Sequence, residues 1–248
     1  MSDAPAAIAA PDGPVLAVFA HPDDAEISSG ATLAKFAARG RAVHLLVLTN
    51  GDRGAQDPAT DRAALAATRA AETAAAAAHL GLAAATVLDT HDGELENVPA
   101  VRARIAAEVR RVRPAVVVTP DPTAWFFEDR YFNHRDHRKA GETTLDAVFP
   151  AAGSALFFQD ELAGLEPWDV PQVWLAWTGQ PNHTEDVTGL LDRKLAALAL
   201  HESQVGGDGI RFFEEWLPVE AAEAGKRIGV EHGENFRVLR LVETGELD

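Results

Sequence analysis

Cysteine is absent from the 248 residues of this chain. Disulfide bonds, thiolate catalysis and cysteine-based zinc sites are therefore excluded. Any metal ion bound by this protein must be held by histidine, aspartate or glutamate, whose nitrogen and oxygen atoms suit zinc and other divalent ions.

Positive charge is also scarce, because 22 Lys and Arg residues face 38 Asp and Glu residues and give a net charge of -16. Nucleic acid and anionic membrane surfaces would be repelled, so neither is expected as a partner. No apolar run approaches the ~20 residues that span a bilayer. Residues 1–14 lack the basic and apolar parts of a signal peptide, which favours a cytoplasmic protein.

Glycine-rich phosphate-binding loops are missing as well. Neither Gly-x-Gly-x-x-Gly nor a Walker loop follows the first apolar run, which disfavours a nucleotide-binding enzyme. The apolar fraction of 47% is ordinary for a globular protein. The length and composition predict a flexible start over residues 1–14 and a single domain over residues 15–248.

Apolar runs typical of buried strands alternate with helix-favouring segments through the first half of the chain. Strands are predicted at residues 15–20, 43–49, 85–88 and 115–119, and helices at 26–39, 61–79 and 99–112. This alternation predicts an α/β, Rossmann-like fold in three layers with a mainly parallel sheet. Binding sites of such sheets lie at the carboxyl edge of the strands.

The second half is less regular. A helix is predicted at residues 138–148, ending near Pro150, and another at 187–204. Strands are predicted at 172–178 and 236–241, and a flexible loop at 206–209.

The first polar constellation follows the first strand, where His21, Asp23 and Asp24 flank and follow Pro22. A turn there can aim His21 and Asp24 at one point as metal ligands, and it leaves Asp23 free as a base. The alternative is an ordinary polar loop in which Asp23 or Asp24 caps the following helix.

The second constellation, residues 133–137, follows the fourth strand. If Asn133 caps a helix, His134 and His137 lie on one face of it, one turn apart. Asp136 would lie in the first turn and could orient an imidazole. The alternative is a charged helix start with solvated histidines. Together the two constellations offer two histidines and one aspartate for a metal, and a spare acid and base for hydrolysis.

The chain resembles the LmbE/PIG-L family of zinc-dependent N-deacetylases. The resemblance rests on the segments AHPDDAE (20–26), LTNGDRG (48–54) and HRDH (134–137), with RAAE (69–72), DG (92–93) and HESQ (201–204). It implies that His21, Asp24 and His137 bind Zn²⁺, with Fe²⁺ as the alternative metal in the cell. It also implies that Asp23 is the general base and that a protonated His134, oriented by Asp136, stabilises the oxyanion and protonates the leaving amine.

The resemblance places Arg53, Arg69 and Asp92 near a sugar site. Loop ordering, or an ion pair between Arg69 and Glu72, is the alternative for the arginines, and bracing of the metal loop is the alternative for Glu26. The chain departs from the mycothiol-pathway branch at Phe132, where that branch has an oxyanion-stabilising tyrosine. The neighbouring Tyr131 is expected to face elsewhere. Ala25, inserted before Glu26, favours the bacillithiol-like branch of the family.

Other residues receive simpler interpretations. Among the histidines, His44 and His79 are expected in packing and His183 and His232 in loops, whereas His201 is left open. Residues 125–127 are aromatic and belong either to the core or to a lid. Trp168, Trp174 and Trp177 are expected in the core or an interface.

The function implied by the resemblance is hydrolysis of the acetyl amide of an N-acetylated amino sugar. Action on a thiol-sugar conjugate or a secondary metabolite is one alternative. A non-catalytic metal- or sugar-binding module is the alternative of another class. The implied partner is a small N-acylated molecule, and a homo-oligomer is left open.

Overall fold

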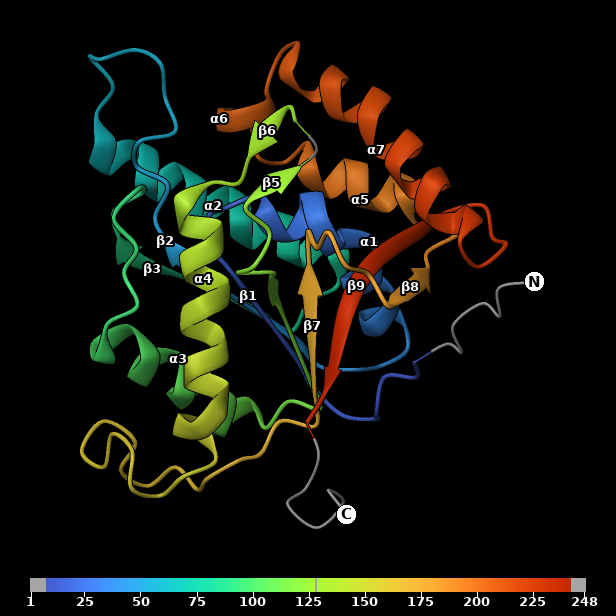
Figure 1. Cartoon of the computed structure of the whole chain (residues 1–248). Coiled ribbons are helices and arrows are strands. Elements are labelled where there is room, and N and C mark those ends of the chain that lie inside the picture. The colour runs from blue at the N-terminus through green and yellow to red at the C-terminus, as the bar shows by residue number, and fades with distance from the viewer. Residues whose placement is uncertain (1–7, 128, 242–248) are drawn as a thin grey trace.

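A seven-stranded sheet lies at the centre of the computed structural model, which describes residues 8–127 and 129–241 (Figure 1). Its strands stand in the order β3-β2-β1-β4-β7-β9-β8. The first five of these are parallel, whereas β9 runs antiparallel to both β7 and β8. The strands are β1 (Val15–Phe19), β2 (Val43–Thr49), β3 (Ala84–Thr90), β4 (Val116–Pro120), β7 (Gln172–Ala176), β8 (His183–Asp186) and β9 (Gly233–Arg240).

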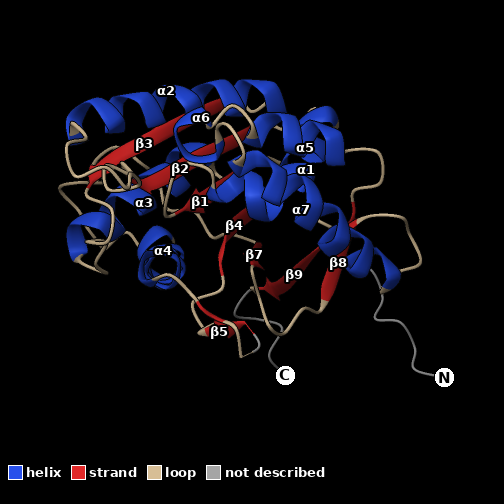
Figure 2. Cartoon of the chain, turned by 90° about the horizontal axis from the view of Figure 1, so that it is seen from above, coloured by secondary structure: helices blue, strands red, loops and turns tan. Residues whose placement is uncertain are grey.

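Helices cover both faces of this sheet, as the view from above shows (Figure 2). One face carries α1 (Asp24–Ala38), α2 (Arg62–Leu80), α5 (Leu191–Leu198), α6 (Glu202–Val205) and α7 (Gly209–Lys226). The other carries α3 (Pro99–Val112), α4 (Arg135–Asp146) and a π-helical segment, Ala147–Ala152. The predicted Rossmann-like, three-layer α/β fold is confirmed.

The alternation of side chains along β1 explains why both faces are covered. Phe19 packs in one core cluster with Leu33 and Phe36 of α1, whereas Val18 packs in another with Ile105 of α3. All five β1 residues are buried. A strand apolar at every position needs a helical layer on each side, because successive side chains point to opposite faces.

The strand order reverses beside β1, which has β2 on one side and β4 on the other. The connections after β1 and β4 therefore leave the sheet edge on opposite sides, at the position where folds of this kind place their binding sites. Polar residues that follow these two strands meet at that edge. Among the described residues, no helix is long and apolar enough to cross a membrane.

The late part of the chain differs from the sequence prediction. The helix expected at 187–204 is two helices, α5 and α6, separated by a turn at which His201 enters the core with no exposed surface. Helix α7 was not predicted, because Pro218 lies inside it and proline normally ends a helix. Burial of Leu217 and Ala221 against α5 stabilises this helix in spite of the proline.

Two histidines also differ from expectation. His183 lies in β8 instead of a loop, where its buried ring contacts Trp174 at a centroid distance of 4.8 Å. His79 is exposed near the end of α2 instead of packed. At the start of the chain, residues 1–7 lie outside the described residues. Within residues 8–14, Ile8 packs against the core, and the carbonyl of Gly13 accepts a hydrogen bond from Arg41.

A buried ion pair joins three elements on the α1 face. The Lys194 ammonium on α5 lies 2.6 Å from the Glu234 carboxylate on β9, and both side chains are about 5% exposed. The same carboxylate accepts hydrogen bonds from the backbone N–H groups of Ala31 and Thr32 on α1. Each of its oxygens is thereby satisfied, which is the condition under which a buried charge is tolerated.

Removing this charge should destabilise the fold. We expect Glu234→Gln to lower the free energy of unfolding by about 3 kcal/mol, because it leaves the Lys194 ammonium buried without a counter-charge. Urea denaturation of the variant and the parent protein measures the difference.

The matched control is Glu223→Gln, which removes the carboxylate of an exposed i,i+3 pair with Lys226 and is expected to change stability little. Equal, small effects of the two substitutions would show that the buried pair does not hold these elements together.

Candidate active site

The loop that follows β1 has a strained backbone. Asp23 adopts a left-handed φ of 93°, a conformation that costs a non-glycine residue on the order of 1 kcal/mol. It stands at the N-cap of α1, yet its side chain makes no capping hydrogen bond in the described structure. The alternative in which Asp23 is an ordinary helix cap is therefore wrong. Its strain is of the kind found at functional sites.

Asp24, the first residue of α1, lies between two histidines. Its Oδ2 accepts a hydrogen bond from the backbone N–H of His21 at 2.8 Å and lies 3.3 Å from the Nδ1 of that ring. Its Oδ1 lies 3.1 Å from Nε2 of His137 on α4. Burial raises the pKa of Asp24, but the two histidines outweigh burial and lower it well below the ordinary value. The three residues expected as metal ligands are thus in direct contact.

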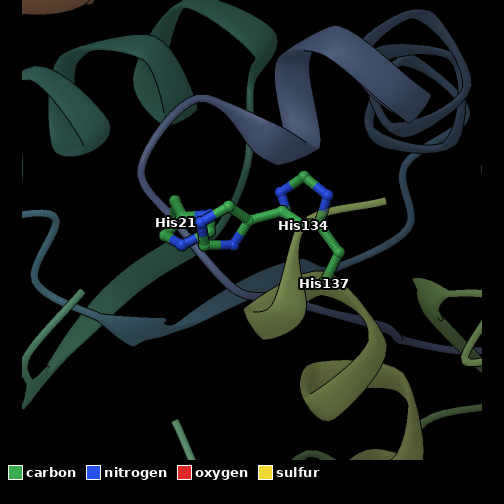
Figure 3. A group of neighbouring side chains, drawn as sticks. All are labelled: His21, His134 and His137. Carbon is green, nitrogen blue, oxygen red and sulfur yellow. The ribbon is translucent and has the colours of Figure 1, made fainter. Parts of the chain in front are cut away.

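Three imidazoles converge on this point from the β1 loop and from α4 (Figure 3). One ring nitrogen each of His21, His134 and His137 lies within 4.8 Å of the others. The potential ligand atoms of a second group, His21, Asp92 and Asp136, also lie within 4.8 Å of one another. His21 belongs to both groups and is therefore the centre of the cluster.

The donor set fits a metal ion such as zinc. Nε2 of His21 is buried and has no hydrogen-bond partner among the described residues, although Asp92 Oδ1 lies 3.2 Å away. A buried nitrogen left unpaired is costly and calls for a partner. Burial opposes protonation of His21, but Asp24, Asp136 and Asp92 together raise its pKa well above the ordinary value. This concentration of negative charge around an imidazole also suits a bound cation.

Asp23 lies beside the cluster, and its carboxylate contacts the guanidinium of Arg69. The Arg69 guanidinium, 3% exposed, lies 3.3 Å from Asp23 Oδ2 and donates to the carbonyls of Pro22 and Gly51. Burial and the neighbouring Asp24 raise the pKa of Asp23 to about 7, against the lowering effect of Arg69. A carboxylate with this pKa is suited to accept a proton near neutral pH.

Arg69 was expected at a sugar site, but the structure places it beneath the β1 loop. This corresponds to the loop-ordering alternative. The alternative ion pair with Glu72 does not form, because the Glu72 carboxylate accepts hydrogen bonds from the backbone and hydroxyl of Ser203 instead.

The other two residues expected near the sugar have different positions. Asp92 reaches the cluster itself, as its contact with His21 shows. Arg53 is partly exposed, pairs with Glu94 and donates to the carbonyl of Asp92 at 2.7 Å, so it orders the loop after β3.

Asp136 differs from the expectation that it orients His134. Its fully buried carboxylate accepts a hydrogen bond from the backbone of Gly93 at 2.7 Å and lies 3.5 Å from Nε2 of His21. The His134 ring is held instead by the backbone N–H of Asp136, which donates to its Nδ1 at 3.2 Å. The Asp136 carboxylate therefore lies next to His21 and not next to His134.

His134, and not Asn133, is the N-cap residue of α4. Burial and the neighbouring His21 and His137 lower the pKa of His134. This direction favours a neutral ring, whereas the resemblance implies a protonated one. A neutral imidazole that accepts at Nδ1 carries its proton on Nε2 and can still donate a hydrogen bond.

Trp177, which the sequence placed in the core or an interface, belongs to the site. Its ring stacks on His137 at a centroid distance of 4.7 Å and an angle of 25°. Trp177 has a left-handed φ of 52° and comes directly after β7, at the same carboxyl edge as His21. A position directly after a strand that ends at this edge is the sequence signal that could have identified Trp177. His201, left open, lies 3.4 Å from Glu26, and both are buried.

The aromatic segment before His134 is not in the core. It forms a small hairpin of β5 (Phe126–Phe127) and β6 (Tyr131–Phe132), seen above the sheet edge in Figure 1. Phe126 and Phe132 are each more than 70% exposed. The Tyr131 and Phe132 rings lie nearly parallel, with centroids 6.4 Å apart, and the expectation that Tyr131 faces away from the oxyanion position stays a prediction.

Known proteins resemble this chain along most of its length. A diacetylchitobiose deacetylase from Thermococcus kodakarensis is 34% identical, covering 90% of this chain and 82% of the relative. A 1D-myo-inositol 2-acetamido-2-deoxy-alpha-D-glucopyranoside deacetylase from Kineococcus radiotolerans is 30% identical, covering 94% and 79%. The solved structure of N,N'-diacetylchitobiose deacetylase from Pyrococcus horikoshii, bound to an inhibitor, superimposes with a TM-score of 0.83 at 31% identity, covering 94% and 88%.

Residues 16–148 match the PIG-L family, described as GlcNAc-PI de-N-acetylase. That span contains the β1 loop, Arg69, Asp92 and the two histidines of α4. The family match and the coverage of the relatives agree with the resemblance inferred from the sequence motifs. The chain belongs to the PIG-L family.

Proposed function

We propose that this protein is a zinc-dependent N-deacetylase that removes the acetyl group from the amide nitrogen of an N-acetylated amino sugar. The observation that carries the proposal is the placement of the Asp23 carboxylate, whose side chain is 15% exposed, beside His21, Asp24 and His137. The relatives named above are deacetylases of N-acetylated sugars, which supports the same reaction class.

His21, Asp24 and His137 would hold the metal, because their donor atoms are already gathered around the Asp24 carboxylate. Zinc bound there would act as a Lewis acid that polarises the amide carbonyl and makes a water molecule more acidic. Fe²⁺ is the alternative ion, since the same nitrogen and oxygen donors suit it.

Asp23 would take the proton from the attacking water. Its contact with Arg69 fixes the orientation of the carboxylate and keeps part of it ionised near neutral pH in spite of burial. With the left-handed backbone at Asp23, this side chain makes no helix-capping hydrogen bond and contacts Arg69 instead.

His134 would supply the hydrogen bond that stabilises the developing oxyanion. Its Nδ1 is occupied by the backbone N–H of Asp136, so the neutral ring carries its proton on Nε2, which is the donor such a role requires. The proton taken up by Asp23 must then reach the leaving amine, by direct transfer or through this imidazole.

The substrate is proposed to be a small N-acetylated amino sugar. Asp92 lies 3.2 Å from Nε2 of His21 and would accept a hydrogen bond from a sugar hydroxyl close to the reacting amide, and the exposed aromatic rings of the hairpin would offer an apolar surface to a sugar ring. A cytoplasmic location and a single domain over residues 15–248 remain part of this proposal. A fold of this kind hosts several reactions, so the substrate must be tested directly.

The first prediction concerns the metal and the substrate together. We expect zinc-loaded protein to release acetate and a free amine from N,N'-diacetylchitobiose or another N-acetylglucosamine derivative. Chelation should abolish this release and added zinc should restore it. His137→Ala should lose both metal and activity, because one of the proposed ligands is gone.

Amine release measured by a fluorogenic amine reagent, together with metal analysis, gives the readout. The matched control is His79→Ala, since His79 is exposed near the end of α2. Full activity in the metal-free protein, or no release from any N-acetylated sugar, would contradict the proposal.

The second prediction concerns the base. Asp23→Asn should lower kcat/KM by about 10² to 10⁴ while the metal content stays unchanged, because general-base catalysis is lost without loss of a ligand. Asp160→Asn, at an exposed loop position, should leave kcat/KM at the parent value. An unchanged rate in Asp23→Asn would remove Asp23 from the catalytic step.

The third prediction concerns pH. The Arg69 charge lowers the pKa of Asp23, so Arg69→Gln should raise that pKa further. Because the base acts when ionised, the acidic limb of the kcat/KM profile should move to higher pH by about 1 unit. Arg53→Gln, which removes an exposed guanidinium, should not move it. A shift to lower pH would show that Arg69 does not act on the base.

A further inference from the structure

Asn133 is the buried residue that immediately precedes His134. It is 1% exposed, and the sequence assigned it only the role of a helix cap. Its side chain instead points to His137, one turn along α4, and the two atoms Oδ1 and Nδ1 are 3.0 Å apart. Its amide nitrogen donates to the carbonyl of Ala124 at 2.9 Å.

These two contacts fix the direction of the amide. Only the NH₂ group can donate to the Ala124 carbonyl, so the oxygen of the amide must be the atom that faces His137. An oxygen facing an imidazole nitrogen accepts a hydrogen bond, so Nδ1 of His137 carries the proton. In the neutral ring Nε2 then holds the lone pair and faces the Asp24 carboxylate oxygen 3.1 Å away, so these two acceptors need a cation between them, either a metal ion or, when no metal is bound, a second proton on the ring.

His134 has the opposite arrangement. Its Nδ1 faces a backbone N–H, the donor from Asp136, and must therefore present a lone pair. In the neutral ring the proton then lies on Nε2. The two histidines lie on one turn of α4, their ring centroids 5.3 Å apart, yet one presents a lone pair at Nε2 and the other a proton.

We propose that Asn133 is a positioning residue that fixes the tautomer of His137 and thereby makes His137, and not His134, the metal ligand supplied by α4. The inference rests on the metal site of the proposed function. One nitrogen of His134 lies within 4.8 Å of a nitrogen of each of the other two histidines. The inference explains why His134 nevertheless acts as a hydrogen-bond donor and not as a metal ligand. Partners of this kind typically change metal affinity 10- to 100-fold when they are removed.

The backbone around Asn133 holds the side chain in place. Its N–H donates to the carbonyl of Trp125 at 2.8 Å, and its carbonyl accepts a hydrogen bond from the Arg138 guanidinium. That guanidinium lies 3.9 Å above the Trp125 ring. Hydrogen bonds to residues 124–125 and to two residues of α4, His137 and Arg138, therefore hold the Asn133 amide in one orientation.

A purely structural role would give different results from a positioning role. Asn133→Asp keeps an oxygen facing His137 but cannot donate to the Ala124 carbonyl, so it loses stability and keeps the tautomer. Asn133→Ala loses both contacts. The difference between the two variants therefore isolates the contact with His137 from the contact with residues 124–125.

The first readout is the proton position on the two rings in the zinc-loaded protein. Nitrogen NMR of ¹⁵N-histidine-labelled protein, recorded about two pH units above the ordinary imidazole pKa of ~6.5, distinguishes a protonated Nδ1 from a protonated Nε2. We expect Nδ1–H for His137 and Nε2–H for His134, with signals assigned by His137→Gln and His134→Gln. A protonated Nε2 on His137 in the parent protein would overturn the inference, whatever the variants do.

The second readout is zinc affinity, measured by competition with a chromophoric chelator. Asn133→Ala should bind zinc about 10- to 100-fold more weakly than the parent, and Asn133→Asp should stay within about 3-fold of it. Asn182→Ala is the control, since Asn182 makes two side-chain hydrogen bonds to the backbone of Val238 in β9, a strand outside the cluster.

Zinc affinity in Asn133→Ala equal to that of the parent would overturn the inference and leave the proposed function intact. If Asn133→Ala does not fold, Asn133→Asp decides the matter, because a 10-fold loss of affinity in that variant would contradict the role given to the oxygen. A parent protein that binds no zinc would contradict the proposed function and the metal site on which this inference rests.

Discussion

The Asp24 carboxylate is the contact on which the rest of the site depends, because it joins two segments that are far apart in the chain. One of its oxygens contacts the loop after β1, and the other contacts α4, which follows β4 and the aromatic hairpin. A buried carboxylate is stable only when such partners surround it. The contact therefore requires both strands to deliver their loops to one place, which the reversal of strand order beside β1 achieves.

Much of this arrangement could be predicted from the sequence. The apolar run of β1 and the helix-strand alternation indicated the sheet, and the carboxyl edge followed from its parallel strands. His21 and Asp24 directly follow β1, and His134 and His137 follow β4 after the hairpin, so the parallel sheet indicated that these groups meet. The resemblance to the family, and not the local pattern, singled out His137 as the third ligand.

The partners of each polar group could not be predicted in the same way. Nothing near Arg69 in the sequence indicates that its guanidinium lies beneath Pro22 and Gly51, because that contact depends on how α2 packs beside α1. The resemblance assigned Asp136 to His134, whereas its carboxylate lies 3.5 Å from Nε2 of His21. Trp177 was missed because the predicted strand ran through residue 178 and placed Trp177 inside it, whereas β7 ends at Ala176.

The left-handed backbone of Asp23 has a consequence for how this protein can change over evolutionary time. The residue combines a strained φ with a partly buried carboxylate whose pKa is raised to about 7, and each of these features costs folding free energy. A glycine at this position would remove both costs together with the carboxylate. Stability and activity are thus opposed at a single residue, and a copy of this chain released from selection for activity would gain stability by losing its base.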